Sequence, residues 1–345
     1  MTTRHVIVVT YGEPPSPAFV DQLTYSWRIL LGLTRTVAKI PAAAIPFIAL
    51  SRAHGRRRLW REHAYRSPLE PVTHTQAATL RGELQQADPA VEWKVHVAYE
   101  FRHPLVDAIL ATLPGDDPVW IAPMYAADSA FTHELSRQAA AAAAARQRRR
   151  AAVRVLPALD PDALADISAR HVIGCLENDR DDHHKTALVL AAHGTLLEPE
   201  RPIETGRAST EQLCDAIAAR LSSTFGLIAN GWLNHTRGGR WTEPPIEETL
   251  KRVRDAGFSK VVYYPYGFLA DNAESQLEGQ LAAAARPELQ IRFLPCLNGS
   301  AELAAAIARL ITGGAVVAPA SNGEACHDLP AHLARHAHSA SDRRV

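Results

Sequence analysis

Two stretches of the chain, VIVVTYGEP at residues 6–14 and LVLAAHGTL at residues 188–196, decide the fold. In each stretch an apolar run leads into a titratable side chain and then a single glycine, Tyr11-Gly12 in the first and His193-Gly194 in the second. A short apolar run bounded by a turn signal is typical of a buried strand in a parallel sheet. The matching pair indicates that the chain contains two similar halves.

Two further pairs of segments keep the same order along the chain. VWIAPMYAADSAFT at 119–132 resembles VVYYPYGFLADNAES at 261–275, and VRVLPALDPDALADI at 153–167 resembles IRFLPCLNGSAELAAAI at 291–307. Chance similarity is the alternative for segments this short. Because three pairs occur in one order, we favour an internal repeat.

Strand-like runs alternate with longer helical stretches, which favours parallel βαβ units. The fold class predicted is α/β, with two similar Rossmann-like lobes, each holding a mainly four-stranded parallel sheet flanked by helices. The expected strands are His5–Thr10, Trp93–Tyr99, Pro118–Pro123, Val153–Leu156, Thr186–Ala192, Leu227–Trp232, Lys260–Pro265 and Gln290–Leu294.

The predicted division of the chain has three parts. The first lobe covers residues 1–165 and the second covers 166–315, with its final helix free to pack back on the first lobe. Residues 316–345 hold four histidines and are expected to form a disordered tail. A metal-handling tail is the alternative.

The first lobe carries an insertion at about residues 15–66 that mixes apolar helical runs with the basic cluster Arg56–Arg58. Loops of this length inside a compact domain are usually functional or disordered. The apolar character favours a lip that covers a flat apolar ligand or touches a bilayer surface. An ordinary buried pair of helices is the alternative.

Composition excludes several classes of protein. The 345 residues include 37 basic and 37 acidic side chains, which gives no general attraction to nucleic acid. The four cysteines are widely spaced and are expected to be reduced thiols of a cytoplasmic protein, although an even number also permits disulfides. We expect membrane contact, if any, to be peripheral and to involve the lip.

The candidate site lies where the strands end, because ligands of open parallel sheets bind at the carboxyl ends of the strands. Tyr11, Tyr125, His193 and the segment 266–274 follow apolar runs directly. The glycines there are single, so dinucleotide and P-loop motifs are absent from the sequence. Imidazole, carboxylate and phenol groups suit an exchange of protons for a metal ion, and they also suit hydrolysis.

From about residue 5 to 312 the chain resembles the ferrochelatases, which insert ferrous iron into a porphyrin. The resemblance rests on segments in a fixed order: Tyr11-Gly12-Glu13-Pro14, Ser67-Pro68-Leu69 with Thr73 and Gln76, LAAHGT around His193, Trp241 with Pro244, and GFLADNAES at 267–275. It implies two Rossmann-like lobes with a porphyrin cleft between them. The implied reaction is the formation of haem from protoporphyrin IX or coproporphyrin III.

The resemblance also implies roles for particular residues. His193 and Glu274 become the acceptors of the pyrrole protons, and with Tyr11 they contact the metal. Iron is then a substrate, no organic cofactor is expected, and no iron–sulfur cluster is expected because only Cys326 lies in the tail. The implied porphyrin-binding residues are Tyr11, Ser67, Tyr125, Trp241, Asp271 and Asn272.

Two positions depart from the family pattern. Asn272 stands where the family has a histidine, and Leu233–Arg237 replaces a Q-S-R-x-G stretch. His235 is either a substitute for the missing histidine or a surface-loop residue. Two alternatives therefore stay open: a non-catalytic tetrapyrrole carrier, and a cobalt or nickel chelatase for a reduced tetrapyrrole. The long lip favours a porphyrin.

Overall fold

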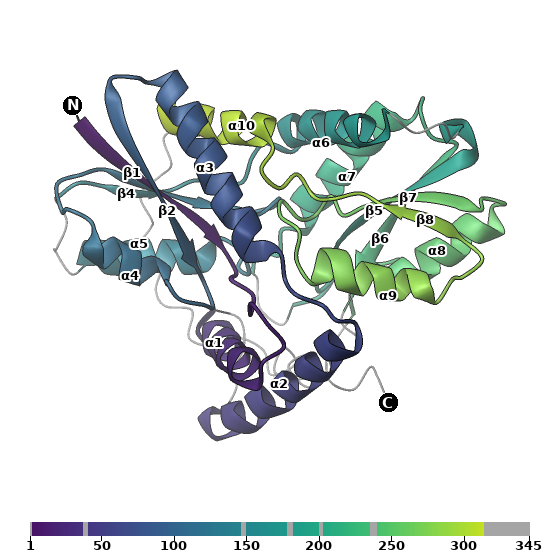
Figure 1. Cartoon of the computed structure of the whole chain (residues 1–345), viewed down its shortest axis with the longest axis horizontal. Coiled ribbons are helices and arrows are strands. Elements are labelled where there is room, and N and C mark those ends of the chain that lie inside the picture. The colour runs from purple at the N-terminus through teal and green to yellow at the C-terminus, as the bar shows by residue number, and fades with distance from the viewer. Residues whose placement is uncertain are drawn as a thin grey trace.

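The computed structural model describes residues 2–36, 41–145, 150–177, 182–199, 203–234 and 240–313. The predicted tail and His235 lie outside these ranges. Within them the strands form two four-stranded parallel sheets that lie side by side (Figure 1). The first sheet has the order β2-β1-β3-β4 and the second the order β6-β5-β7-β8.

All eight predicted strands are confirmed, with ends that shift by at most a few residues. Both sheets place the strands of each half in the same relative order, which confirms the two-lobe α/β fold. The strands are β1 Thr2–Thr10, β2 Val91–Tyr99, β3 Val119–Pro123, β4 Val153–Val155, β5 Thr186–His193, β6 Leu227–Leu233, β7 Lys260–Tyr264 and β8 Gln290–Phe293.

Helices cover both faces of the sheets, and several begin with a side-chain cap. Asp160 accepts hydrogen bonds from the N–H groups of Asp162 and Ala163 at the start of α6, and Ser300 accepts one from Leu303 at the start of α10. The helices of the two lobes are α3 Leu69–Ala87, α4 Val106–Thr112, α5 Glu134–Ala145, α6 Pro161–Leu176, α7 Arg207–Leu221, α8 Ile246–Asp255, α9 Gly279–Ala284 and α10 Ala301–Thr312.

Short helical turns complete the described secondary structure. They are the 3₁₀ helices η1 Ala42–Ala44 and η2 His183–Lys185, and the π-helix η3 Glu274–Glu278, which leads directly into α9.

One apolar cluster runs through both lobes. It joins Val8 of β1 and Leu80 of α3 to Leu190 of β5 and Ile307 of α10. The last helix, α10, lies beside α3 at the top of Figure 1, and Thr79 of α3 donates a hydrogen bond to the carbonyl oxygen of Gly299. The two lobes therefore share buried surface, although the predicted residue limits between them stay a prediction.

The insertion of the first lobe forms two packed helices, α1 Phe19–Thr36 and α2 Ile45–Glu62, which lie below the two sheets in Figure 1. Leu30 and Ile48 pack between these helices and against Leu196 of the second lobe. Val20 and Phe47 are more than 70% exposed on the outer surface of the pair. Among the described helices, none is long and apolar enough to span a membrane.

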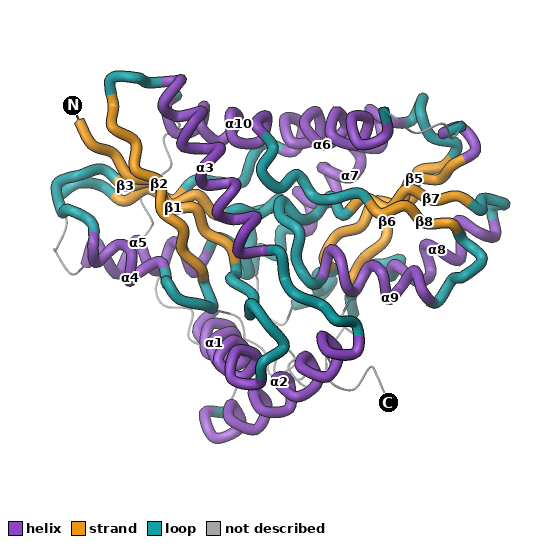
Figure 2. The backbone as a smooth tube through the Cα atoms, in the orientation of Figure 1, coloured by secondary structure: helices purple, strands orange, loops and turns teal. Residues whose placement is uncertain are grey.

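Polar contacts hold the strand ends of the two lobes against each other. Gln76 of α3 donates a hydrogen bond to the carbonyl oxygen of Leu269. The N–H of Ala130 donates a hydrogen bond to the carbonyl oxygen of Glu204. The loops that follow the strands fill the space between the sheets (Figure 2). The carboxyl ends of β1, β3, β5 and β7 consequently meet in one region, where the sequence placed the site.

Candidate active site

A cavity of about 260 Å³ lies between the lobes at these strand ends. Its wall takes residues from the ends of β1 and β5, from the loops after β3 and β7, and from the lip helices. The lip contributes Tyr25, Ile29, Arg52 and Arg56, so the insertion covers the site as well as packing on itself.

The second lobe supplies an imidazole and a carboxylate. His193 is the last residue of β5, and its ring lies 6.5 Å from the ring of Trp241 in an edge-on arrangement. Glu274 is the first residue of η3. Its Oε2 atom is buried and accepts no hydrogen bond from any described residue. Both side chains line the cavity, so residues 81 positions apart are brought to one surface.

Asn272 has a structural task at the start of η3. Its Oδ1 atom accepts hydrogen bonds from the backbone N–H groups of Glu274 and Ser275, both at 2.9 Å, and its Nδ2 group donates to the carbonyl oxygen of Ala270. An asparagine that satisfies free N–H groups at a helix start is a common capping arrangement. The residue in the family's histidine position thus fixes the turn that carries Glu274.

The charged groups around Glu274 change its pKa in opposite directions. Burial, with the Glu13 carboxylate adding to it, raises the pKa of Glu274 to about 7, while Arg56 and Arg52 lower it. Burial and the neighbouring Arg56 lower the pKa of Arg52 to about 10. A carboxyl group with a pKa near 7 changes its protonation state in the neutral range, which suits a proton acceptor.

The first lobe supplies phenols. The rings of Tyr11 and Tyr125 are 5.2 Å apart in the cavity wall, and the Tyr125 hydroxyl donates a 2.9 Å hydrogen bond to Oε2 of Glu100. Burial raises the pKa values of Tyr11 and Tyr125, so both phenols stay protonated at neutral pH. Burial also raises the pKa of Glu100 well above the usual carboxyl range.

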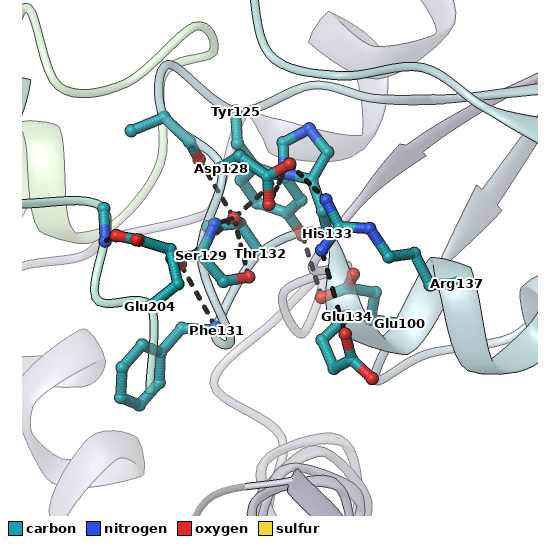
Figure 3. A network of polar contacts seen from close by, with 12 residues as sticks. Glu100, Tyr125, Asp128, Ser129, Phe131, Thr132, His133, Glu134, Arg137 and Glu204 are labelled. Atoms are coloured by element: carbon teal, nitrogen blue, oxygen red, sulfur yellow. Dashed lines mark hydrogen bonds and ion pairs between the residues drawn. The ribbon is translucent and has the colours of Figure 1, made fainter. Parts of the chain in front are cut away.

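The loop after β3 is held by a network of hydroxyl groups (Figure 3). Thr132 donates to the carbonyl oxygen of Ala127 and accepts from the N–H of Ser129. His133 packs behind Tyr125 with ring centroids 6.0 Å apart, and burial lowers the pKa of this histidine to about 4. Arg137 pairs with Asp128 on the outer side of the loop. The wall carrying Tyr125 is therefore held in place from behind.

Six of the eight site residues expected from the sequence line this cavity: Tyr11, Tyr125, His193, Trp241, Asn272 and Glu274. Ser67 and Asp271 lie outside the lining. Ser67 donates its hydroxyl hydrogen to Glu13, and Asp271 accepts hydrogen bonds from the Cys296 N–H and the Asn298 amide. Contacts of these two residues with a porphyrin stay a prediction.

Sequence reasoning missed Glu100 and gave no role to Glu13. Glu100 follows the strand Trp93–Tyr99 directly, so the rule that selected Tyr11 and His193 would have selected it as well. Glu13 belongs to a quoted motif, but its buried contact with the N–H of Ala273 joins residues 260 positions apart. A single sequence offers no signal for a contact of that kind.

The cavity offers proton acceptors of two kinds beside apolar and aromatic walls. A neutral imidazole and a carboxylate are ligands that iron and zinc accept. Within the described ranges, no three His, Cys, Asp or Glu side chains are grouped so that they could hold a metal ion.

The sequence is similar to those of known proteins. The family model described as Ferrochelatase matches residues 4–314. The coproporphyrin III ferrochelatase of Staphylococcus saprophyticus is 23% identical over 227 residues, which cover 60% of this chain and 69% of that protein. The ferrochelatase of Rhodopseudomonas palustris strain HaA2 is 25% identical over 274 residues, covering 75% of this chain and 76% of that protein.

A solved structure has the same architecture. SirB from Bacillus subtilis with Fe³⁺ superimposes with a TM-score of 0.50 and 12% sequence identity, over 95% of this chain and the whole of that one. At this identity the likeness concerns the two-lobe α/β fold alone.

Proposed function

Because the chain belongs to the ferrochelatase family of enzymes, which insert a metal ion into a tetrapyrrole, we propose that its substrates are ferrous iron and a porphyrin. The porphyrin is protoporphyrin IX or coproporphyrin III, and the product is the corresponding haem. The observation that carries the proposal is that His193 and Glu274 line one cavity together with the phenols of Tyr11 and Tyr125.

The proton balance of the reaction requires acceptors for two protons. A free-base porphyrin carries two pyrrole N–H groups, and Fe²⁺ replaces both protons. In the proposal His193 takes one proton and Glu274 the other. The raised pKa of Glu274, about 7, makes it a stronger base than an ordinary carboxylate. Tyr11 lies against the macrocycle and reaches the metal as it enters.

The walls are suited to a flat aromatic ligand. Tyr11, Tyr125 and Trp241 present ring faces or edges to the cavity, and Ile29 and Phe268 add apolar surface. A site that grips the macrocycle can bend it, so that the pyrrole lone pairs point out of the ring plane. Strain of about 1–5 kcal/mol is within reach of such binding. In the proposal Arg52 of the lip, which lines the cavity, binds a carboxylate of the porphyrin.

One observation favours a second candidate, a non-catalytic tetrapyrrole carrier. Asn272 stands in the family's histidine position, and an amide does not accept a proton at neutral pH. Its hydrogen bonds are committed to the start of η3. A carrier would need the cavity and its rings but would not need His193 or Glu274 as bases.

A fluorescence titration separates the two candidates. Coproporphyrin III or protoporphyrin IX is titrated into the protein under anaerobic conditions, and Fe²⁺ or Zn²⁺ is then added. Insertion by the enzyme removes the free-base emission, and the metalloporphyrin spectrum replaces it. Porphyrin binding without insertion of either metal would overturn the proposed activity in favour of the carrier.

The assignment of the bases needs matched variants. His193→Ala and Glu274→Ala should keep porphyrin affinity within about threefold while insertion falls by about 100-fold or more, as expected for loss of a general base. His74 and Glu288 are exposed and lie outside the cavity lining, so His74→Ala and Glu288→Ala are the controls. Equal losses in the control variants would contradict the assignment.

A further inference from the structure

The carboxylate of Glu13 is buried where three segments of the chain meet. Its side chain is only 3% exposed. The Oε2 atom accepts a 2.7 Å hydrogen bond from the Ser67 hydroxyl and a 3.1 Å hydrogen bond from the N–H of Ala273. The Oε1 atom lies 4.0 Å from a guanidinium nitrogen of Arg56. Buried carboxylates are costly unless they are bonded in this way.

The three contacts come from functionally different places. Ser67 precedes α3 and also accepts a hydrogen bond from the N–H of Leu69. Arg56 belongs to the lip helix α2, where it stacks over the rings of Tyr25 and Trp60. Ala273 is the residue immediately before η3. One carboxylate thus joins the end of β1, the lip and the helix that bears Glu274.

The direction of the Glu13 side chain is set by the turn after β1. Gly12 has φ +76°, a conformation that side chains rarely adopt, and a Cβ atom there would lie 2.4 Å from Cβ of Tyr99. Glu13 therefore leaves the strand in a fixed direction. It does not line the cavity, so its carboxylate does not touch a substrate placed there.

Glu274 depends on its backbone for its position. Its Oε2 atom has no hydrogen-bond partner among the described residues. Asn272 holds the N–H groups of Glu274 and Ser275 from within the turn, and the hydrogen bond from the N–H of Ala273 to Glu13 ties this turn to the end of β1 in the first lobe. Ala273 also packs with Trp60 and Leu277 in a small apolar cluster.

We propose that Glu13 is a positioning residue for Glu274: its carboxylate reaches across the lobe interface and holds the first turn of η3 in place. The consequence for metal insertion rests on the proposed function, whereas the effect on the backbone of η3 does not. The reach of the side chain carries this role, because both hydrogen bonds are made by the single atom Oε2.

Two conservative variants separate reach from charge. Glu13→Gln keeps the length of the side chain, and its amide oxygen can accept both hydrogen bonds, but it loses the charge near Arg56. Glu13→Asp keeps the charge but withdraws the carboxylate by one methylene group, which breaks the 2.7 Å and 3.1 Å contacts.

The first measurement is hydrogen exchange by mass spectrometry on the peptide that spans residues 270–279. We expect Glu13→Asp to exchange these amides at least about tenfold faster than the natural protein, and Glu13→Gln to stay within about threefold, since the lost bonds are to a charged acceptor. Unchanged exchange in Glu13→Asp would overturn the proposal, whether or not the natural protein inserts metal.

The second measurement is Zn²⁺ insertion together with porphyrin affinity. Glu13→Asp should lower kcat by about 10- to 100-fold with porphyrin Kd within about twofold, and Glu13→Gln should retain most of the activity. The reverse order, with Asp active and Gln inactive, would show that charge and not reach matters, and would overturn the proposal. If the natural protein inserts no metal, the proposed function fails and the exchange result alone decides the role of Glu13.

Discussion

Tyr125 in the cavity wall donates its hydroxyl hydrogen to Glu100, which lies behind that wall, at a distance of 2.9 Å. The other oxygen of Glu100 is buried and accepts no hydrogen bond from the described residues. Burial raises the pKa of Glu100 well above its usual value, because burial disfavours the ionised carboxylate. The hydrogen bond to Glu100 holds the Tyr125 phenol beside the ring of Tyr11.

Substitution of Glu100 therefore tests a hydrogen bond more than a charge. Glu100→Gln keeps an acceptor oxygen, so its free energy of unfolding should lie within about 0.5 kcal/mol of that of the natural protein. Glu100→Leu leaves the Tyr125 hydroxyl without this acceptor and should lower the free energy of unfolding by about 1–3 kcal/mol. Urea unfolding at pH 6 measures both. A Gln variant as unstable as the Leu variant would mean that the ionised carboxylate is what stabilises this wall.

The fold was predictable because its signals are local. Apolar runs such as 188–192 lie in central strands that are buried on both faces. Such a run and the glycine that follows it can be recognised within a short stretch of sequence. The equal order of strands in the two sheets follows from the repeat of those runs.

The site was predictable in part. Tyr11 and His193 follow strands, and a general rule places such residues at the carboxyl edge of the sheet. The hydrogen bonds of Ser67 with Glu13 and of Asp271 with Cys296 join segments that are distant in the sequence. A single sequence does not reveal contacts of this kind. The sequence shows Asn272 only as the absence of the family's histidine. Its role as a helix cap depends on the turn in which it accepts a hydrogen bond from the N–H of Glu274.

Metal insertion should depend on pH through Glu274. Its pKa is raised to about 7, mainly by burial, so its basic form is lost as the pH falls through that value. We expect the rate of Zn²⁺ insertion to decrease as the pH falls from about 8 to about 6, where each unit below the pKa costs about tenfold. A flat profile between pH 5 and 8 would contradict Glu274 as a base.

Glu274 should also make the stability of the protein depend on pH, with the opposite sign to that of a carboxylate in an ion pair. Its folded pKa lies above the ordinary value of 4.5, so the folded protein holds a proton that the unfolded chain releases. Stability is then lost as the pH rises from about 4.5 towards 7, by up to about 3 kcal/mol. Glu274→Gln should remove this slope in urea unfolding between pH 5 and 8, while Glu288→Gln, at an exposed carboxylate, should leave it in place.

Asp271 should matter for stability more than for porphyrin affinity. Its two oxygens accept hydrogen bonds from the Cys296 N–H at 2.9 Å and from the Asn298 amide at 2.8 Å. Asp271→Ala leaves these donors unpaired and should cost about 2–4 kcal/mol, with the porphyrin Kd changed by less than about threefold. Thermal unfolding and a porphyrin titration check this. A large loss of affinity in a protein of unchanged stability would instead indicate contact with the ligand.

Removal of residues 318–345 should leave metal insertion intact. The described residues that line the cavity lie between Thr10 and Glu278, and the last described helix, α10, ends at Thr312, before the deleted segment. We expect the truncated and full-length proteins to insert Zn²⁺ at rates within about twofold. A loss greater than tenfold would revive a metal-handling role for the histidines of that segment.

Placing the family's histidine at position 272 should lower the stability of the protein without raising the rate of metal insertion. Asn272 accepts two backbone hydrogen bonds at the start of η3 with its amide oxygen, a geometry that an imidazole does not reproduce. Loss of such a cap costs about 0.5–2 kcal/mol, and Asn272 is 3% exposed, so the larger ring must also displace its neighbours. We therefore expect Asn272→His to unfold at lower temperature and to insert Zn²⁺ no faster than the natural protein. Asn272→Asp keeps the accepting oxygen and is the matched variant, which should retain more of the stability. A several-fold rise in the insertion rate of Asn272→His would show that Glu274 lacks a partner base in this chain, and that the asparagine limits catalysis.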